Sequence, residues 1–190
     1  RDDILVAHQV PLSKIGGSDS SAIAAALSQE DITDQLAEFM TVSNELVWDR
    51  EKNDLIRHIE WKLDGMRLRT VRQKPEPSKQ TTAALIERIH ATSLQALTWN
   101  DNAISLRQRV AFLHSRNSEW PDWSNKNLLN SLSEWLEPYL AGCTSRNDLE
   151  ALNVALILRS GLPMHLGSEL DALAPERVTL NNGAELTIAY

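Results

Sequence analysis

The sequence predicts an α+β fold: an N-terminal β part that is OB-like or a meander, a bundle of about five helices, and a closing β-hairpin. Short apolar runs and an Asp-Gly turn characterise the first part. Pro75 and Pro77 end it, because two prolines cannot lie in a central strand. Apolar residues at helical spacing follow. We therefore expect a β-rich domain over residues 1–77 and a helical domain over residues 78–190.

Three segments open the β part. Ile4–Ala7 is a short apolar run, which ends before Pro11 and the Gly16-Gly17-Ser18 cluster. Ala22–Leu27 fits either a strand or a buried helix, since periodicity alone does not separate them. Asp31–Met40 has the spacing of an amphipathic helix.

A hairpin is predicted around Asp64-Gly65, because this pair accepts the positive φ angles of a type I′ turn. A two-residue loop leaves one face of the hairpin apolar. On the other face Lys62 lies opposite Arg67, and Glu60 lies opposite Arg69 as a favourable cross-strand pair. This second face is therefore basic.

Helix start signals recur through the second part. Ser78, Asp101 and Ser124 are candidate caps, and Ser145 to Asp148 resembles a capping box. The fourth helix is expected to end at Gly161, and a fifth helix to span Met164–Leu173. Residues expected to face inward are Leu85, Ile86, Ile89, Ile104, Leu106, Val110, Leu113, Leu128, Leu129, Leu132, Trp135, Leu136, Leu149, Leu152 and Leu156.

The last residues, Arg177–Tyr190, alternate like a second hairpin. A three-residue loop, Asn181-Asn182-Gly183, puts Gly183 at the left-handed bulge position. It places Val178 opposite Leu186 on an apolar face. We expect this face to lie on the rest of the chain, because a lone hairpin is marginally stable.

Composition limits the setting of the protein. Of 190 residues, 42% are hydrophobic, but no run of about 18 apolar residues would span a membrane. The single cysteine, Cys143, cannot form an internal disulfide and is expected to be buried as a small apolar group, which fits a reducing cytoplasm. The sequence begins with Arg1, and we expect it to be part of a longer chain.

One short segment is basic within an acidic protein. The net charge is −7, yet residues 50–79 hold nine Lys or Arg and five Asp or Glu, a net charge of +4. Such a strip is either an ordinary solvated face or a surface that contacts nucleic-acid phosphates without reading sequence. The candidate residues are Arg57, Lys62, Arg67, Arg69, Arg72 and Lys74.

Signatures of enzymes are missing from the sequence. It has no phosphate-binding loop, dinucleotide fingerprint or nucleophile elbow, and its five histidines are scattered without metal-ligand spacing. Exposed acid pairs lack the environment that separates the pKa values of catalytic carboxylates. The six tryptophans are expected mainly in the core, with Trp120 and Trp123 the most exposed of them.

Several blocks nevertheless form a recognisable pattern. It resembles the C-terminal region of HrpB-type bacterial ATP-dependent helicases of the DEAH-box kind, most strongly from Glu45 to Tyr190. The blocks that carry the resemblance are Leu97-Thr98-Trp99-Asn100-Asp101, Leu106–Leu113, Trp120-Pro121-Asp122-Trp123-Ser124, Glu134–Gly142, Leu170–Pro175 and the closing hairpin.

The resemblance implies a non-catalytic accessory region that follows the motor domains of a longer helicase, and no catalytic residue carries over. ATP and magnesium would serve the upstream motor in cis. The region would help to hold single-stranded RNA or DNA; alternatively, it would brace the motor or bind proteins without touching nucleic acid. The chain departs from the family pattern at two places. The family usually ends this block with Ile-Asp-Tyr, whereas the chain has Ile188-Ala189-Tyr190. The basic strip on its predicted strands also holds fewer arginines than is usual in the family.

Overall fold

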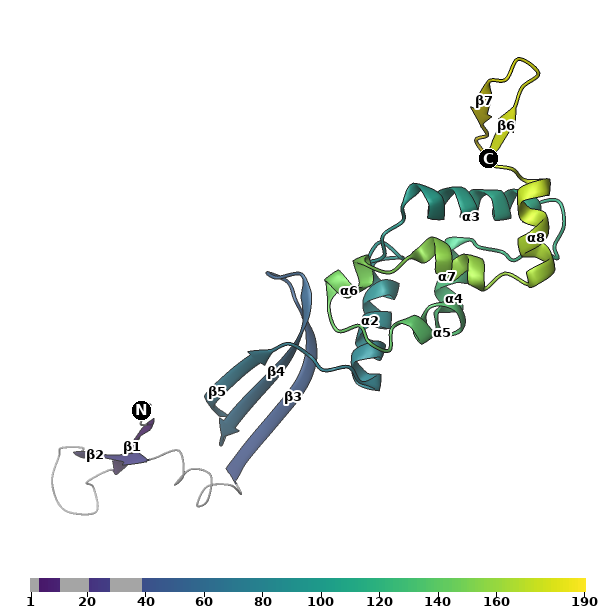
Figure 1. Ribbon diagram of the computed structural model, residues 1–190. Helices are drawn as coiled ribbons and strands as arrows, with labels where there is room; N and C mark the ends of the chain where they lie inside the picture. Colours follow the sequence, from purple (N-terminus) through teal and green to yellow (C-terminus); the bar gives the residue numbers. More distant parts are fainter. Residues whose placement is uncertain (1–3, 11–20, 28–38) are drawn as a thin grey trace. The chain divides into compact units, whose positions relative to one another are not determined.

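The computed structural model describes residues 4–10, 21–27 and 39–190, with side chains from residue 39 onward (Figure 1). These residues form two compact units. The first contains the described residues up to Asn44 together with His58–Val71, and the second contains Glu45–Arg57 and Arg72–Tyr190. The predicted division after residue 77 stays a prediction.

Strands dominate the first part of the chain, as expected. β1 and β2 pair antiparallel, with Ala7 opposite Ala24, so the ambiguous Ala22–Leu27 segment is a strand. A three-stranded sheet has the order β3-β4-β5, which is a meander. Most of the predicted Asp31–Met40 helix lies outside the described residues. The strand bounds are β1 Ile4–Val10, β2 Ser21–Leu27, β3 Met40–Asp49, β4 Asp54–Leu63 and β5 Met66–Gln73.

The predicted two-residue turn joins β4 to β5. Asp64 and Gly65 have φ angles of 45° and 81°, the positive values that a type I′ turn needs. A Cβ on Gly65 would meet no atom within 4 Å, so backbone conformation, not space, favours glycine there.

Helices follow Ser78 and surround an apolar core in the second unit. Their bounds are α2 Lys79–Ala91, α3 Asp101–His114, α4 Asn125–Asn130, α5 Leu132–Trp135, the 3-10 helix η3 Glu137–Tyr139, α6 Arg146–Glu150, α7 Val154–Ser160 and α8 Met164–Leu173. The α+β class, the β-first order and the bounds of α8 are confirmed.

Two of the five predicted helices are each interrupted, which gives seven α-helices in the described residues. The third divides at Ser131, whose hydroxyl donates to the carbonyl of Asn127 at 2.8 Å. The fourth divides at Asn153, whose side chain caps α7 by accepting from the Leu156 amide at 3.1 Å. This cap starts a new helical phase, and Leu156, predicted to face inward, is 64% exposed.

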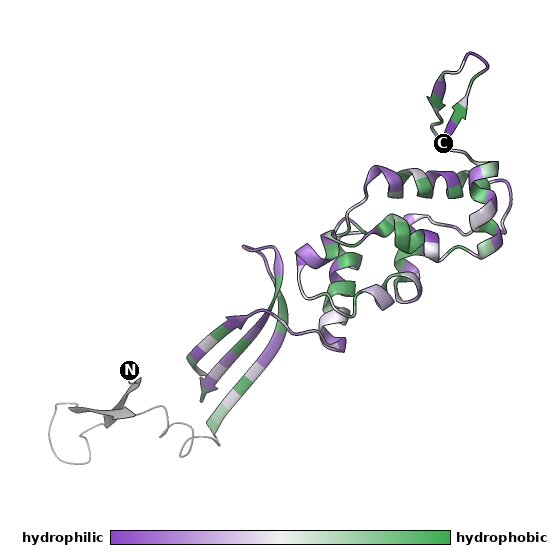
Figure 2. Cartoon of the chain, in the orientation of Figure 1, coloured by the Kyte–Doolittle hydropathy of each residue, from purple (hydrophilic) through white to green (hydrophobic). Residues whose placement is uncertain are grey.

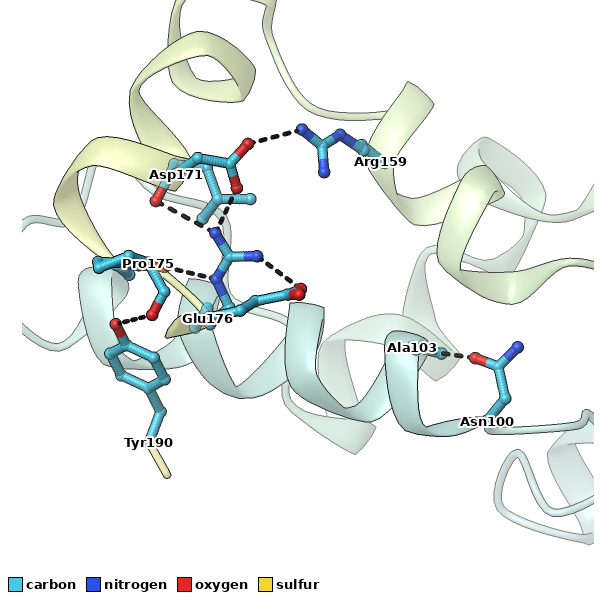
Figure 3. A network of polar contacts seen from close by, with 10 residues as sticks. Asn100, Ala103, Arg159, Asp171, Pro175, Glu176 and Tyr190 are labelled. Carbon is cyan, nitrogen blue, oxygen red and sulfur yellow. Dashed lines mark hydrogen bonds and ion pairs between the residues drawn. The ribbon is translucent and has the colours of Figure 1, made fainter. Parts of the chain in front are cut away.

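Hydroxyl and amide caps set the helix starts. Ser78, Ser124 and Ser145 cap α2, α4 and α6 as predicted. The predicted cap Asp101 is wrong: Asn100 accepts from the Ala103 amide at 2.9 Å (Figure 3), and Asp101 is the first helical residue. Asp101 instead places a negative charge in the first turn, where the helix dipole favours it.

Helix α2 ends in a Schellman arrangement without glycine. The Ser93 amide donates to His90 and the Leu94 amide to Ile89, each at 3.1 Å. Both Ser93 and Leu94 have left-handed backbones, with φ of 51° and 72°. Leu94 is buried in the core, and this burial offsets the conformational cost.

Arg109 is a fully buried charged side chain on α3. Its guanidinium donates to the carbonyl oxygens of Ala174 and Leu170 and pairs with the carboxylates of Asp171 and Glu176. Figure 3 shows Asp171 and Glu176 on the same guanidinium, with Arg159 pairing to Asp171 at 3.2 Å. One side chain therefore fastens α3 to the end of α8 and to the start of the terminal hairpin.

The terminal hairpin has the predicted register. β6 (Arg177–Thr179) and β7 (Glu185–Thr187) pair with Val178 opposite Leu186, and Gly183 has φ of 82°. Apolar and polar residues alternate along it (Figure 2). Within the described residues its apolar face is exposed rather than packed on the rest of the chain, which corrects the prediction: Val178, Leu180 and Leu186 are 39%, 42% and 53% exposed.

The base of this hairpin is anchored by the last tyrosine. The Tyr190 hydroxyl donates to the Pro175 carbonyl at 2.8 Å (Figure 3), and its ring meets Phe112 edge-on at 5.1 Å between centroids. The Ile188 amide donates to the Glu176 carbonyl at 3.0 Å. Contacts at the base, rather than the apolar face, hold the hairpin.

The burial of three further residues differs from the sequence prediction. Trp120 and Trp123, predicted to be the most exposed tryptophans, are buried, because they fold inward on either side of Pro121-Asp122. Ile104, predicted to face inward, is 42% exposed. Cys143 is buried as predicted, and burial raises the pKa of its thiol.

The left-handed end of α2 generates the first testable prediction. Ser93→Gly should stabilise the protein by about 0.5–1 kcal/mol, because relief of the left-handed strain exceeds the added entropy of an unfolded glycine. Urea unfolding measures this change in the free energy of unfolding. The matched control is Ser115→Gly at the end of α3, where φ is −62°; this change should destabilise. A loss of stability in Ser93→Gly would contradict the assignment.

The Arg109 contacts generate the second prediction. Arg109→Met should destabilise the protein by about 3–5 kcal/mol, since the change removes a buried guanidinium and leaves the carbonyls of Leu170 and Ala174 without that donor. Arg159→Met is the control: it removes another partner of Asp171, but an exposed one, and should cost about 1 kcal/mol or less. Equal losses of stability in the two variants would contradict the role assigned to the Arg109 contacts.

Asp171 adds a pH dependence. The hydrogen bond from Arg109 is the main cause that lowers the pKa of the Asp171 carboxyl, and burial opposes it. A lowered folded-state pKa gives stability that is present above the unfolded pKa of about 3.9 and is lost as the pH falls through the folded value. Asp171→Asn should therefore destabilise at pH 7 and differ less from the parent protein at pH 3, as measured by urea midpoints.

Candidate nucleic-acid interface

The β4–β5 hairpin gathers part of the predicted basic strip. Lys62 Nζ and Arg67 Nη1 lie 2.7 and 3.8 Å from the two carboxylate oxygens of Glu60. The Lys62 and Arg67 side chains are 42% and 69% exposed, while that of Glu60 is 13% exposed. The two cations therefore stand on the solvent side of a shielded carboxylate.

The Glu60 carboxylate is held in its charged form. The hydrogen bond from Lys62 is the main cause that lowers the pKa of Glu60, burial opposes it, and the charges of Lys62, Arg67 and His58 add to the lowering. At neutral pH the Lys62, Arg67 and Glu60 group thus carries one net positive charge. Glu60 orders the two cations but halves their combined charge.

Arg69 departs from its predicted pairing. Its guanidinium lies over the ring of Trp61, with the guanidinium carbon 5.4 Å from the ring centroid, and it forms no ion pair with Glu60 within the described residues. An exposed arginine over a half-buried tryptophan is a cation–π pair. Arg69 and Trp61 together offer a flat charged surface on the same hairpin as Lys62 and Arg67.

The other three predicted cations belong to the second compact unit. Arg72 lies 3.8 Å from Asp49, whose pKa is lowered chiefly by the backbone hydrogen bond from Lys52. The positive charge of Lys74 interacts favourably with the Asp148 carboxylate. Arg57 is a half-buried residue of β4. The structure therefore brings Lys62 and Arg67 together on Glu60, keeps Arg69 on the same hairpin, and places the remaining three in another unit.

Sequence reasoning missed two further arginine–tryptophan pairs in the second unit. The Arg88 guanidinium lies 4.6 Å from the Trp48 ring centroid, and both side chains donate to the Asn53 amide oxygen at 3.0 Å. Arg107 lies 5.2 Å from the Trp99 ring centroid. Only the number of tryptophans signalled such pairs, because the partners share no motif or local spacing.

The described residues also limit other chemistry. No group of three or more His, Cys, Asp or Glu side chains in that part of the chain is arranged to hold a metal ion. Among the helices described, none is both long and apolar enough to cross a membrane.

Comparison with known proteins shows which class of protein the chain resembles. Residues 135–190 match a family model described as "ATP-dependent helicase C-terminal". The chain is thus similar, over its last third, to the C-terminal region of ATP-dependent helicases. This matched region includes α6, α7, α8 and the terminal hairpin.

The particular helicase that it resembles is HrpB. The chain is 25% identical over 200 residues to the ATP-dependent RNA helicase HrpB of Escherichia coli strain K12, covering all of this chain and 24% of that relative. Two crystal structures of E. coli HrpB, described as a DExH-box NTPase and as a DEAH/RHA helicase, share the fold, with TM-scores of 0.60 and 0.59 and identities of 23% and 22%. Each match covers 88% of this chain and 21% of the other.

These findings confirm the resemblance to the C-terminal region of an HrpB-type helicase. The chain spans about a quarter of the length of the relative that it matches.

Proposed function

We propose that the chain is the accessory C-terminal region of a bacterial cytoplasmic ATP-dependent helicase and helps the upstream motor to hold single-stranded nucleic acid, RNA in particular. ATP and magnesium serve the motor domains in cis, and the region itself is non-catalytic. The matches to helicase C-terminal regions support this assignment.

The observation that carries the proposal is the β4–β5 hairpin. Lys62 lies on β4, and Arg67 and Arg69 lie on β5, on either side of the Asp64-Gly65 turn; Arg67 is largely exposed. Lysine and arginine bind phosphates without reading sequence, which suits a motor that moves along many sequences. Trp61 beneath Arg69 adds an aromatic surface of the kind on which bases stack.

A second candidate function is a brace that packs against the rest of the helicase without touching nucleic acid. The exposed apolar face of the terminal hairpin, made by Val178, Leu180 and Leu186, favours it. Under this alternative the chain does not bind RNA even at low salt. In the complete helicase, Leu186→Asp would then lower the unfolding temperature of the motor while leaving this chain's own stability unchanged.

Charge reversal tests the first function. The double variant Arg67→Glu with Arg69→Glu should abolish binding of a single-stranded RNA oligonucleotide, followed by fluorescence anisotropy. Any binding that remains at low salt should depend less steeply on salt, because the loss of two phosphate contacts should reduce the magnitude of the slope of log Kobs against log salt by about 1.4.

The control is the double variant Arg50→Glu with Lys52→Glu, which changes the net charge equally at exposed residues of the β3–β4 turn. A specific interface predicts a much smaller effect there. Unchanged binding in the hairpin variant would exclude the hairpin, and equal weakening in both variants would show a general charge effect instead.

A further inference from the structure

A cavity of about 550 Å³ lies in the second unit, apart from the basic hairpin. Its walls come from the left-handed turn after α2, one face of α3 from Ile104 to Ala111, and the segment that leads into α4. This volume is within the range of small-molecule sites. Its lining includes Trp99, Ile104, Arg107, Gln95, Gln108 and Asn125.

The wall of the cavity is a fixed aromatic and cationic pair. The Trp99 indole donates to the Leu94 carbonyl at 3.1 Å, which ties the ring to the left-handed turn. The Arg107 guanidinium lies 5.2 Å from the Trp99 ring centroid. Arg107 Nε and Nη2 donate to the Trp123 carbonyl and to the Asn125 amide oxygen, both at 2.7 Å. These hydrogen bonds hold the Trp99 and Arg107 side chains in their positions.

Arg107 is partly withdrawn from water. Burial is the main cause that lowers the pKa of its guanidinium, and the nearby Asp122 carboxylate opposes the change. Arginine still remains protonated at neutral pH. Asp122 accepts from the Ser124 amide at 2.8 Å and from the Asn127 side chain of α4, so both carboxylate oxygens already have partners.

The rim of the cavity combines an apolar side chain with side-chain amides that can donate and accept hydrogen bonds. Ile104 is 42% exposed, and the cavity that it lines explains why it fails to face the core. Gln95, Gln108 and Asn125 are exposed amides, each with donors and an acceptor. A planar ring with donors and acceptors on its edge matches this surface, since bases stack on tryptophan or on guanidinium planes and are recognised by side-chain amides.

We infer that this cavity binds a nucleobase, stacked on the Trp99–Arg107 pair with its edge toward the side-chain amides and its phosphate toward Arg107. The inference shares its partner, single-stranded nucleic acid, with the proposed function and to that extent rests on it, but it uses a different surface. A base within a strand and a free nucleotide share this chemistry, so the experiment separates the two sources.

Indole N–H signals in a ¹H–¹⁵N NMR spectrum of the whole chain report on both surfaces at once. The probes are uridine monophosphate, adenosine monophosphate and an eight-nucleotide oligouridine. Trp99 reports on the cavity, Trp61 on the hairpin, and Trp135, whose indole donates to the Leu128 carbonyl at 2.9 Å, is the internal reference. Signals are assigned with single Trp→Phe variants.

A shift of the Trp99 signal with oligouridine supports the inference, and a shift with a monophosphate as well identifies a free-nucleotide site. A shift at Trp61 alone overturns the inference and leaves the proposed function standing. A shift at Trp99 alone supports the cavity against the hairpin. No shift at either tryptophan overturns both, as does binding that shifts Trp135 equally.

Filling the cavity provides a variant that removes no existing interaction. Ala111 is exposed and lines the cavity, so Ala111→Phe should block it without disturbing the fold and should weaken oligouridine binding at least about 5-fold, the loss expected for one stacked base. Ala83→Phe on α2 is the matched control, since Ala83 is also an exposed helical alanine and does not line the cavity. Unchanged affinity in Ala111→Phe would overturn the inference.

Discussion

The buried guanidinium of Arg109 is the interaction on which the helical unit depends. A charge in an apolar core is tolerated only when it is neutralised and its donors are satisfied. Here two carboxylates and two carbonyls, all from Leu170 to Glu176, surround it. The requirement fixes the end of α8, the turn that follows it and the start of β6 against α3. Tyr190 returns to the same place by donating to the Pro175 carbonyl. The terminal hairpin therefore starts and ends at positions set by one charged side chain.

Local rules explain how much of this fold could be predicted. Asp64-Gly65 and Asn181-Asn182-Gly183 were sufficient for both hairpin turns, because positive φ angles leave few alternatives. Ser78, Ser124 and Ser145 marked helix starts for the same local reason. Asn153 and Ser131 were missed as interruptions, since a polar residue within an apolar period reads as a surface position until its side chain is seen to bond the backbone. Trp120 and Trp123 were misplaced because their burial depends on packing between distant segments.

The candidate surfaces could likewise be predicted only in part from the sequence. The grouping of Lys62 with Arg67 followed from strand alternation, but the shielding of Glu60 beneath them and the stacking of Arg69 on Trp61 did not. The Trp99–Arg107 pair could not be predicted from residue spacing. Trp99 precedes α3, and its orientation is set by its hydrogen bond to the Leu94 carbonyl in a left-handed turn. Sequence patterns therefore locate charges well and locate cavities poorly.

The two ends of the Arg109 contact should differ in how readily they open. Helix α3 is held by buried apolar residues along its length, so its amides should exchange with solvent hydrogen only through global unfolding. The hairpin of β6 and β7 has three residues in each strand and an exposed apolar face. Such a short ladder opens locally at little free-energy cost. The chain thus joins a slowly exchanging helix to a hairpin whose amides exchange fast, and any partner that covers Val178 and Leu186 would be recognised by the protection that it confers on them.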